Sequence, residues 1–324
     1  MPNKIVCRTL GPPETLRLES FASAPLAAGQ VRVAIRAAGI NFPDILMVAG
    51  DYQLKPELPF TPGMEAAGDV VEIAGDVGGV MVGDRVIAKL RHGGYAEEAM
   101  VAPAQLTPLP STFDYAEGAT FLAAHGTAHH ALVDRAQIRP GEVLLVHGAG
   151  GGVGLATVEI GKLLGATVIA AASSEQKLAA ARARGADHGV LYGAEPFREV
   201  VKRITDGRGV DVVFDPVGGE VFEQSLRCIA FGARLLVVGF TGGVGVAKTN
   251  LVLIKGASVL GVRAGEAARR DPALGTARIA ALLQWAEEGR VRPHVSHRLP
   301  LQDVAPAMRL LMDRKAIGRV ALTM

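Results

Sequence analysis

The chain is poor in cysteine, net charge and long apolar runs, and each shortage argues against a class of protein. Cys7 and Cys228 are the only cysteines and lie far apart, so no disulfide framework is expected and a reducing cytoplasm is favoured. The formal net charge is +2 without basic runs, which argues against nucleic acid and anionic membranes as partners. No segment has the roughly 18 consecutive apolar residues of a membrane helix. The first residues, MPNKIVCRTLG, lack the apolar core of a signal peptide, so we expect no export.

What is present describes a large folded chain of 324 residues, 49% hydrophobic and 20% charged, which is long enough for two domains. The first 120 or so residues are rich in proline, glycine and short alternating strands, which predicts a β-rich domain. From about 123 to 263 strands and helices alternate, which predicts one doubly wound parallel sheet. Its six predicted strands are 143–147, 167–173, 189–192, 210–217, 233–240 and 257–263. The remainder predicts helices at 276–288 and 301–314 and a closing strand at 318–323.

The segment 143–154, VLLVHGAGGGVG, runs from an apolar strand into a glycine-rich turn and then a helical pattern. It matches the dinucleotide fingerprint G-x-G-x-x-G with alanine in the first position. Such a turn brings backbone N–H groups and the positive end of a helix up to a pyrophosphate. The predicted cofactor contacts here are Ala149, Gly151, Gly152, Val153 and Gly154.

The end of the second strand indicates which dinucleotide is bound. Enzymes that use NAD place an acidic residue there for the ribose hydroxyls, whereas this chain has Ser173 and Ser174, followed by Lys177. Two hydroxyls and a cation suit a 2′-phosphate, so we expect NADPH. The alternative for Lys177 is a solvated helix position. Tyr192 is either a contact of the same phosphate or a surface aromatic residue.

Several segments together resemble the zinc-free, zeta-crystallin-like quinone oxidoreductase branch of the medium-chain dehydrogenase/reductase superfamily, over nearly the whole chain. They are AAGINFPD (37–44), LPFTPGMEAAGDV (58–70), GDRV (83–86), GGYAE (93–97), VHGAGGGVG, DPVGG (215–219) and LLVVGF (235–240). The resemblance implies an α/β fold in which a Rossmann NADPH-binding domain, 123–263, is inserted into a GroES-like β-rich catalytic domain made of 1–122 and 264–324. It also implies an active site in the cleft between the domains and an assembly of two or four copies, for which we expect a homodimer.

The resemblance further implies that the metal of related alcohol dehydrogenases is missing. Asn41 and Met64 stand where those enzymes have a cysteine and a histidine, and Ala123 lies near the place of a further cysteine. Glu65 alone cannot hold catalytic zinc, which needs three protein ligands. The histidines of the segment 125–130 have no cysteine or carboxylate partner at ligand spacing, so we expect packing or surface roles for them.

Without a metal to polarise an alkoxide, reduction of an electrophilic acceptor is the natural reaction, so we expect hydride transfer from NADPH to quinones or related α,β-unsaturated carbonyls. Arg263 stands where many relatives carry a bulky aromatic pair. It either binds an anionic substrate, which favours an enoyl-CoA reductase of the acryloyl-CoA type, or pairs with Glu266. An alternative of another class is an NADPH-binding structural or regulatory protein without significant turnover.

Other candidate site residues follow from their places in these motifs. Asn41 is predicted to donate to the substrate or the nicotinamide ribose, with a structural turn role as its alternative. Asp44 is predicted to orient that network or to serve as a helix N-terminal charge. Thr127 is expected near the nicotinamide because the family has a hydroxyl there. The remaining candidates are Phe240 and Thr241 after the fifth strand, and Tyr52 and Tyr95, which either face the cleft from loops or simply pack there.

Overall fold

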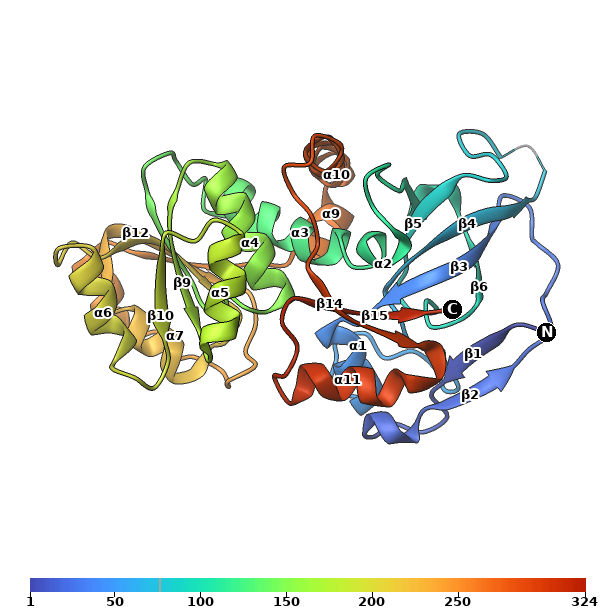
Figure 1. The fold of residues 1–324 in the computed structure, drawn as a ribbon, viewed down its shortest axis with the longest axis horizontal. Coiled ribbons are helices and arrows are strands. Elements are labelled where there is room, and N and C mark those ends of the chain that lie inside the picture. The colour runs from blue at the N-terminus through green and yellow to red at the C-terminus, as the bar shows by residue number, and fades with distance from the viewer. Residues whose placement is uncertain (76) are drawn as a thin grey trace. The chain divides into compact units, whose positions relative to one another are not determined.

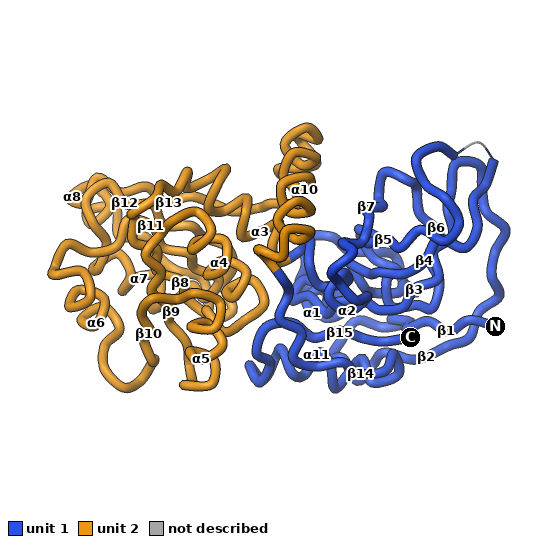
Figure 2. Tube along the Cα trace, turned by 45° about the horizontal axis from the view of Figure 1, so that its top comes forward, with its two compact units in different colours: residues 1–123, 292–324 blue, residues 124–291 orange. Residues whose placement is uncertain are grey.

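Residues 1–75 and 77–324 are described by the computed structural model, in which the chain divides into two units (Figure 2). Unit 1 comprises residues 1–123 and 292–324, and unit 2 comprises residues 124–291. The chain therefore returns to unit 1 after residue 291, whereas the sequence predicts this return after residue 263. The difference arises because helix α10 (Pro272–Glu287) is fastened to unit 2, where its Arg278 donates to Asp134 at 3.0 Å.

The main sheet of unit 1 has seven strands. Six of them follow the order β14-β15-β3-β4-β5-β7, and the seventh, β6, pairs with β3. The closing strand β15 pairs antiparallel with β3, with Ala321 opposite Gly39, so the C-terminal segment completes a sheet begun near the N-terminus. The strands are β1 (Asn3–Val6), β2 (Arg17–Ser20), β3 (Val31–Gly39), β4 (Glu65–Ile73), β5 (Arg85–Lys89), β6 (Glu98–Val101), β7 (Leu106–Pro108), β14 (Val295–Pro300) and β15 (Arg319–Thr323). The helices are α1 (Phe42–Ala49), α2 (Tyr115–Gly118) and α11 (Val304–Met312), with 3-10 turns η1 (Pro13–Thr15), η2 (Pro103–Gln105) and η4 (Leu301–Asp303).

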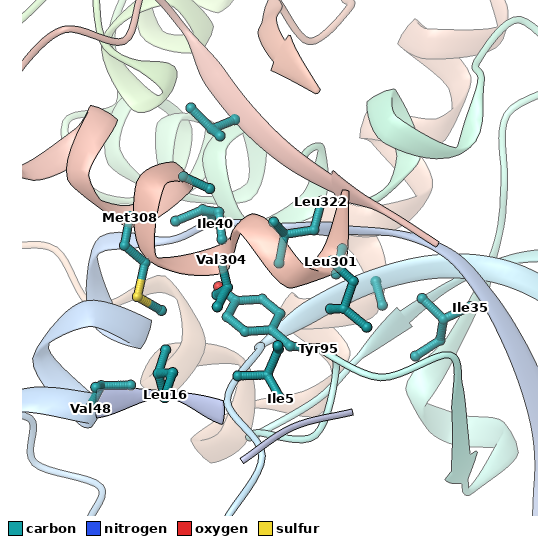
Figure 3. Close-up of a cluster of buried hydrophobic side chains, with 14 of the residues drawn as sticks. Ile5, Leu16, Ile35, Ile40, Val48, Tyr95, Leu301, Val304, Met308 and Leu322 are labelled. Atoms are coloured by element: carbon teal, nitrogen blue, oxygen red, sulfur yellow. The ribbon is translucent and has the colours of Figure 1, made fainter. Parts of the chain in front are cut away.

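The core of unit 1 gathers apolar side chains from segments far apart in the sequence. Figure 3 shows Ile5 of β1, Ile35 of β3, Val304 of α11 and Leu322 of β15 around the ring of Tyr95. All five side chains are at most 3% exposed. The short strands expected in the first 120 or so residues are present, with β3, β4 and β5 among them.

Unit 2 holds a six-stranded, wholly parallel sheet in the order β10-β9-β8-β11-β12-β13. Figure 1 labels β9, β10 and β12 of this sheet among the helices of the unit. Its central strands read as continuous apolar runs because helices cover both faces of such a sheet. All six predicted strands are present, so the α/β fold class is confirmed. They are β8 (Val143–Val146), β9 (Thr167–Ala172), β10 (His188–Leu191), β11 (Val210–Asp215), β12 (Ile229–Val237) and β13 (Ser258–Gly261).

The helices of unit 2 connect these strands and extend beyond them. Helix α3 (Leu122–His129) starts at the end of unit 1 and continues into the π-helical segment η3 (His130–Arg135). The others are α4 (Gly152–Leu163), α5 (Glu175–Ala183), α6 (Phe197–Ile204), α7 (Gly219–Ser225), α8 (Thr249–Lys255), α9 (Ala264–Arg270) and α10. Across the described part of the chain, no helix combines the length and the apolar character needed to cross a membrane.

Candidate functional site

The glycine turn of unit 2 has the backbone that a phosphate-binding turn needs. Gly148 follows β8 with a φ of +58°, and Gly151, which precedes α4, donates its N–H to the Gly148 carbonyl at 2.9 Å. A Cβ atom at Gly154 would lie 2.3 Å from that same carbonyl oxygen, so only glycine allows this close approach. The Ala149 N–H donates to Ala171 at 3.0 Å, which fixes the turn to β9.

This turn presents the N-terminus of α4, a helix of 12 residues, to a ligand. The first N–H groups of a helix have no intrahelical acceptor, and the helix dipole favours an anion at that end. Gly152, Val153 and Gly154 supply these groups here. The arrangement fits the pyrophosphate of a dinucleotide, as the sequence predicted for this segment.

The side chains that follow β9 lie beside this turn. Ser174 is the N-cap of α5 and accepts from the Lys177 N–H at 3.3 Å, while the Lys177 ammonium donates to Ser173 Oγ at 3.3 Å. A Cβ atom at Gly150 would lie 2.5 Å from Lys177 Cβ, so the lysine stem passes directly over the glycine turn. The structure thus brings Ser173, Ser174 and Lys177 together at the carboxyl end of the sheet, where Ser173 is exposed.

Tyr192 reaches the same edge of the sheet, but its hydroxyl turns inward. Its N–H donates to Ala172 at 2.9 Å, which places the residue next to Ser173. Its hydroxyl oxygen lies 2.6 Å from His147 Nδ1, and the two rings stack with centroids 6.0 Å apart. Tyr192 is therefore not a plain surface aromatic residue. The sequence analysis missed His147, which stands inside a predicted strand and carries no signal of its partner.

The residues expected after the later strands of unit 2 lie in loops. Phe240 is 54% exposed and, with Asp215 and Phe222, lines a shallow pocket of about 140 Å³. Thr241 Oγ1 donates to the Pro216 carbonyl at 3.3 Å. Thr127 is half-buried within α3. Phe240 and Thr241 come shortly after β12, which ends at Val237, and so lie on the side of the sheet where doubly wound folds bind ligands.

Arg263 precedes helix α9, and its guanidinium lies 3.9 Å from the Glu266 carboxylate. Glu266 also pairs with Arg269 and Arg270. Of the two roles that the sequence left open for Arg263, the structure therefore shows the pairing with Glu266.

A buried polar cluster lies in unit 1, where α1 begins. Arg319 of β15 donates to Asn41 Oδ1 at 2.7 Å, and the same nitrogen is 3.7 Å from Glu65 Oε2. Asp44 Oδ2 accepts from the Asn41 N–H and from the Tyr95 hydroxyl, both at 2.9 Å. All five residues are at most 7% exposed, so three formal charges are held away from water.

Burial dominates the electrostatics of this cluster. It raises the pKa of Asp44 to about 6 and the pKa of Glu65 to about 7, although the Arg319 guanidinium opposes both shifts. Burial also lowers the pKa of Arg319, against the pull of Glu65 and Asp44. Among the described residues, Asp44 Oδ1 and Glu65 Oε2 have no hydrogen-bond partner. The cluster is therefore sensitive to the removal of its single cation.

Both tyrosines take part in the packing of unit 1, which is the alternative that the sequence left open. Tyr95 is fully buried in the core of unit 1, so its hydroxyl supports Asp44 instead of facing a substrate on an open loop. Tyr52 is half-buried and packs against the same core. Asp44 combines the two roles that the sequence proposed, because it belongs to the polar network and closes the first turn of α1 through the Asn41 N–H.

The donor set in unit 1 does not fit zinc. Asn41, Met64 and Ala123 offer an amide, a thioether and a methyl group, none of which is an ordinary zinc ligand. Among residues 1–75 and 77–324, no group of three or more His, Cys, Asp or Glu side chains is arranged to hold a metal ion. The histidines near α3 do have carboxylate partners, contrary to expectation, since His125 contacts Glu159 and His130 contacts Asp134. In each pair the histidine is buried within unit 2 and the carboxylate is partly exposed.

Comparison with known proteins agrees with this fold. Residues 27–111 match the alcohol dehydrogenase GroES-like domain, and residues 152–286 match the family described as zinc-binding dehydrogenase. The rat quinone oxidoreductase-like protein 2 is 38% identical over 98% of this chain and 91% of its own length. The chain belongs to the quinone oxidoreductase-like branch of the medium-chain dehydrogenase/reductase superfamily.

Solved structures of this superfamily superpose over the full chain. A probable oxidoreductase from Mycobacterium abscessus has a TM-score of 0.91 and 36% identity, covering 100% of this chain and 99% of that one. The Escherichia coli quinone oxidoreductase complexed with NADPH has a TM-score of 0.90 and 28% identity, covering 99% and 100%. Membership of the quinone oxidoreductase-like branch confirms the resemblance found in the sequence motifs.

Proposed function

We propose that this protein is an NADPH-dependent, metal-free reductase that transfers hydride to quinones or related α,β-unsaturated carbonyls. The observation that carries the proposal is the glycine turn with Lys177 above it and serines, instead of a carboxylate, after β9. A cation and two hydroxyls favour a 2′-phosphate over the free ribose hydroxyls of NADH. A structural relative is described as a quinone oxidoreductase complexed with NADPH, which supports the same cofactor here.

In this proposal, different residues of unit 2 bind different parts of the cofactor. The N–H groups of Gly152, Val153 and Gly154 bind the pyrophosphate, and Lys177 with Ser173 and Ser174 binds the 2′-phosphate. Phe240, Thr241 and Thr127 are proposed to contact the nicotinamide half. NADPH, when bound, supplies a hydride from C4 of its nicotinamide ring. The protein supplies binding and orientation, which for well-held reactants lower the barrier by several kcal/mol.

Asn41 is the proposed donor to the acceptor oxygen. Arginine has no acceptor atom, so the bond from Arg319 forces the amide oxygen toward the guanidinium and fixes which end of the Asn41 side chain is the nitrogen. One N–H of that nitrogen is directed to the Gly39 carbonyl at 3.4 Å, and the other is the proposed donor. A reduced quinone carries its new charge on oxygen, where such a donor stabilises it, and its proton comes from solvent.

Quinones are the default acceptors because the relatives are named for them, and the decisive experiment compares acceptors. Chelator-treated protein is given NADPH with a simple benzoquinone, a fused-ring quinone, a linear enone or an acryloyl thioester of coenzyme A. We expect the quinones to support the fastest NADPH oxidation. Preference for the thioester would instead assign an enoyl-CoA reductase and make Arg263 a substrate contact.

A homodimer is the proposed assembly. Strand β13 ends the six-stranded sheet, and among the described residues it pairs only with β12, which leaves a backbone edge for a second copy. Exposed apolar side chains accompany this end of the sheet, with Phe231 81% and Leu253 80% exposed. The buried thiols of Cys7 and Cys228 suit a reducing compartment, for which we propose the cytoplasm.

A further inference from the structure

A row of hydrogen-bonded polar side chains includes the residue that directly precedes the glycine turn, and the proposed chemistry does not use it. His147, which directly follows β8, contacts the Tyr192 hydroxyl at 2.6 Å through Nδ1 and Ser225 Oγ at 2.8 Å through Nε2. Ser225 Oγ in turn donates to the Val221 carbonyl at 2.7 Å. His147 and Ser225 are fully buried, so neither of them meets a substrate.

The direction of every hydrogen bond in this row follows from its last member. A carbonyl only accepts, so the Ser225 hydroxyl proton is committed to Val221 and the Ser225 oxygen must accept from His147 Nε2–H. Burial lowers the pKa of His147 to about 3, so the ring is neutral near pH 7 and Nδ1 carries no proton. Nδ1 therefore accepts from the Tyr192 hydroxyl, whose proton points into the protein.

One member of the row directly precedes the turn in the chain. His147 leads into Gly148, and its own N–H donates to the Phe214 carbonyl at 3.0 Å. Burial raises the pKa of Tyr192, so its hydroxyl keeps the proton that it donates to His147. Gly148 is the residue whose φ of +58° opens the turn. We infer that Tyr192, His147 and Ser225 form one directed hydrogen-bond chain that holds the start of the dinucleotide turn in its binding shape.

The inference rests on the proposed binding of a dinucleotide, and it assigns His147 and Ser225 as positioning residues. It also assigns the Tyr192 hydroxyl to the turn and not to the 2′-phosphate, because the hydroxyl has one proton and His147 takes it. The two assignments predict different selectivity. A side chain that supports the turn affects the binding of the pyrophosphate, and therefore the affinities for both NADPH and NADH. A side chain that contacts the 2′-phosphate affects the affinity for NADPH alone.

The test compares the dissociation constants of NADPH and NADH for the full-length protein. Tyr192→Phe should weaken both by the same factor, about 2- to 10-fold for one lost hydrogen bond. Lys177→Ala serves as the selective comparison, and Tyr115→Phe is the matched control because it removes a hydroxyl bonded to Asp69 in unit 1. Loss confined to NADPH, or no loss with either dinucleotide, would overturn the inference.

A second measurement separates this inference from the proposed function. Nitrogen-15 NMR of labelled histidine reports the tautomer of His147, identified by the signal missing from His147→Gln. The chain requires a proton on Nε2 and none on Nδ1, and Ser225→Ala should disturb that signal. A His147 protonated on Nδ1 would contradict the chain, even if the wild-type protein bound neither dinucleotide and the proposed function itself failed.

Discussion

Arg319 and Asn41, which are 278 positions apart in the sequence, are joined by a 2.7 Å hydrogen bond from the guanidinium to the amide oxygen. The bond connects β15 to the residue that begins α1, and it fixes the orientation of the one side chain that we propose as donor to the acceptor. Among the residues that the structure describes, the same guanidinium is the cation that acts on both buried carboxyl groups, those of Asp44 and Glu65. One arginine thus orients Asn41 and partly offsets the effect of burial on the two carboxyl groups.

Replacing Asn41 with aspartate tests its role as a donor. Asn41→Asp keeps an oxygen for Arg319 but removes the amide N–H groups. We expect kcat to fall by about 10- to 100-fold, as for the loss of one preorganised donor, while the dissociation constant for NADPH changes only a few fold. Steady-state kinetics together with NADPH titration measure both quantities. Unchanged turnover would remove Asn41 from the catalytic residues.

The raised pKa of Glu65 predicts how stability depends on pH. In the folded protein this pKa is about 7, above its ordinary value of 4.5, so the folded state binds the extra proton between those two values. Stability from this group is complete below about pH 4.5 and falls as the pH rises through about 7, by about 3 kcal/mol in total. Glu65→Gln should remove the part of the pH dependence of stability that comes from this carboxyl group. Thermal midpoints of both proteins between about pH 5 and about pH 8 measure it, and parallel curves would contradict the account.

Lys177 is proposed to make the protein prefer NADPH to NADH. Lys177→Ala should raise the KM for NADPH by about 10- to 100-fold, the size expected for one charge-assisted bond, and leave the KM for NADH within a few fold. Lys202→Ala, which removes a lysine from α6 of the same unit, is the control and should change neither constant. Equal effects of Lys177→Ala on the two cofactors would end its assignment to the 2′-phosphate.

The proposed dimer makes a prediction about exposed apolar residues of α8. Leu253→Glu introduces a charge at a side chain that is 80% exposed, and burying that charge in an interface between copies is costly. Sedimentation velocity should therefore show a shift from dimer to monomer. Met81→Glu changes a similarly exposed methionine of unit 1, 70% exposed, and should leave the dimer intact. A wild-type protein that sediments as a monomer would contradict the proposal outright.

Strand positions in unit 2 could be predicted from the sequence, but several strand ends could not. The prediction extended the fourth strand to 217, whereas β11 ends at Asp215. The Asp215 carboxylate accepts from the Val217 and Gly218 N–H groups at 2.7 and 2.9 Å, which turns the chain away from the sheet. The apolar pattern continues past that point because valine follows, so the pattern alone overestimates the strand.

The glycine turn and the residues after β9 were predictable because they are local in sequence. Arg319 and His147 were not, because each lies in an apolar strand pattern and finds its partners only after folding. Arg319 meets Asn41 and Glu65 across the sheet, and His147 meets Tyr192 45 positions away. Sequence patterns show that such a polar residue interrupts an apolar run. They do not show which side chain forms a hydrogen bond or an ion pair with it.

The most direct test of the account is NADPH oxidation by a simple benzoquinone, measured with ordinary NADPH and with NADPH deuterated at the transferred position of C4. We predict oxidation that requires both protein and quinone, is unaffected by a chelator and is slower with deuterium. Tight NADPH binding with no oxidation by any acceptor would contradict the account and favour a binding protein without turnover.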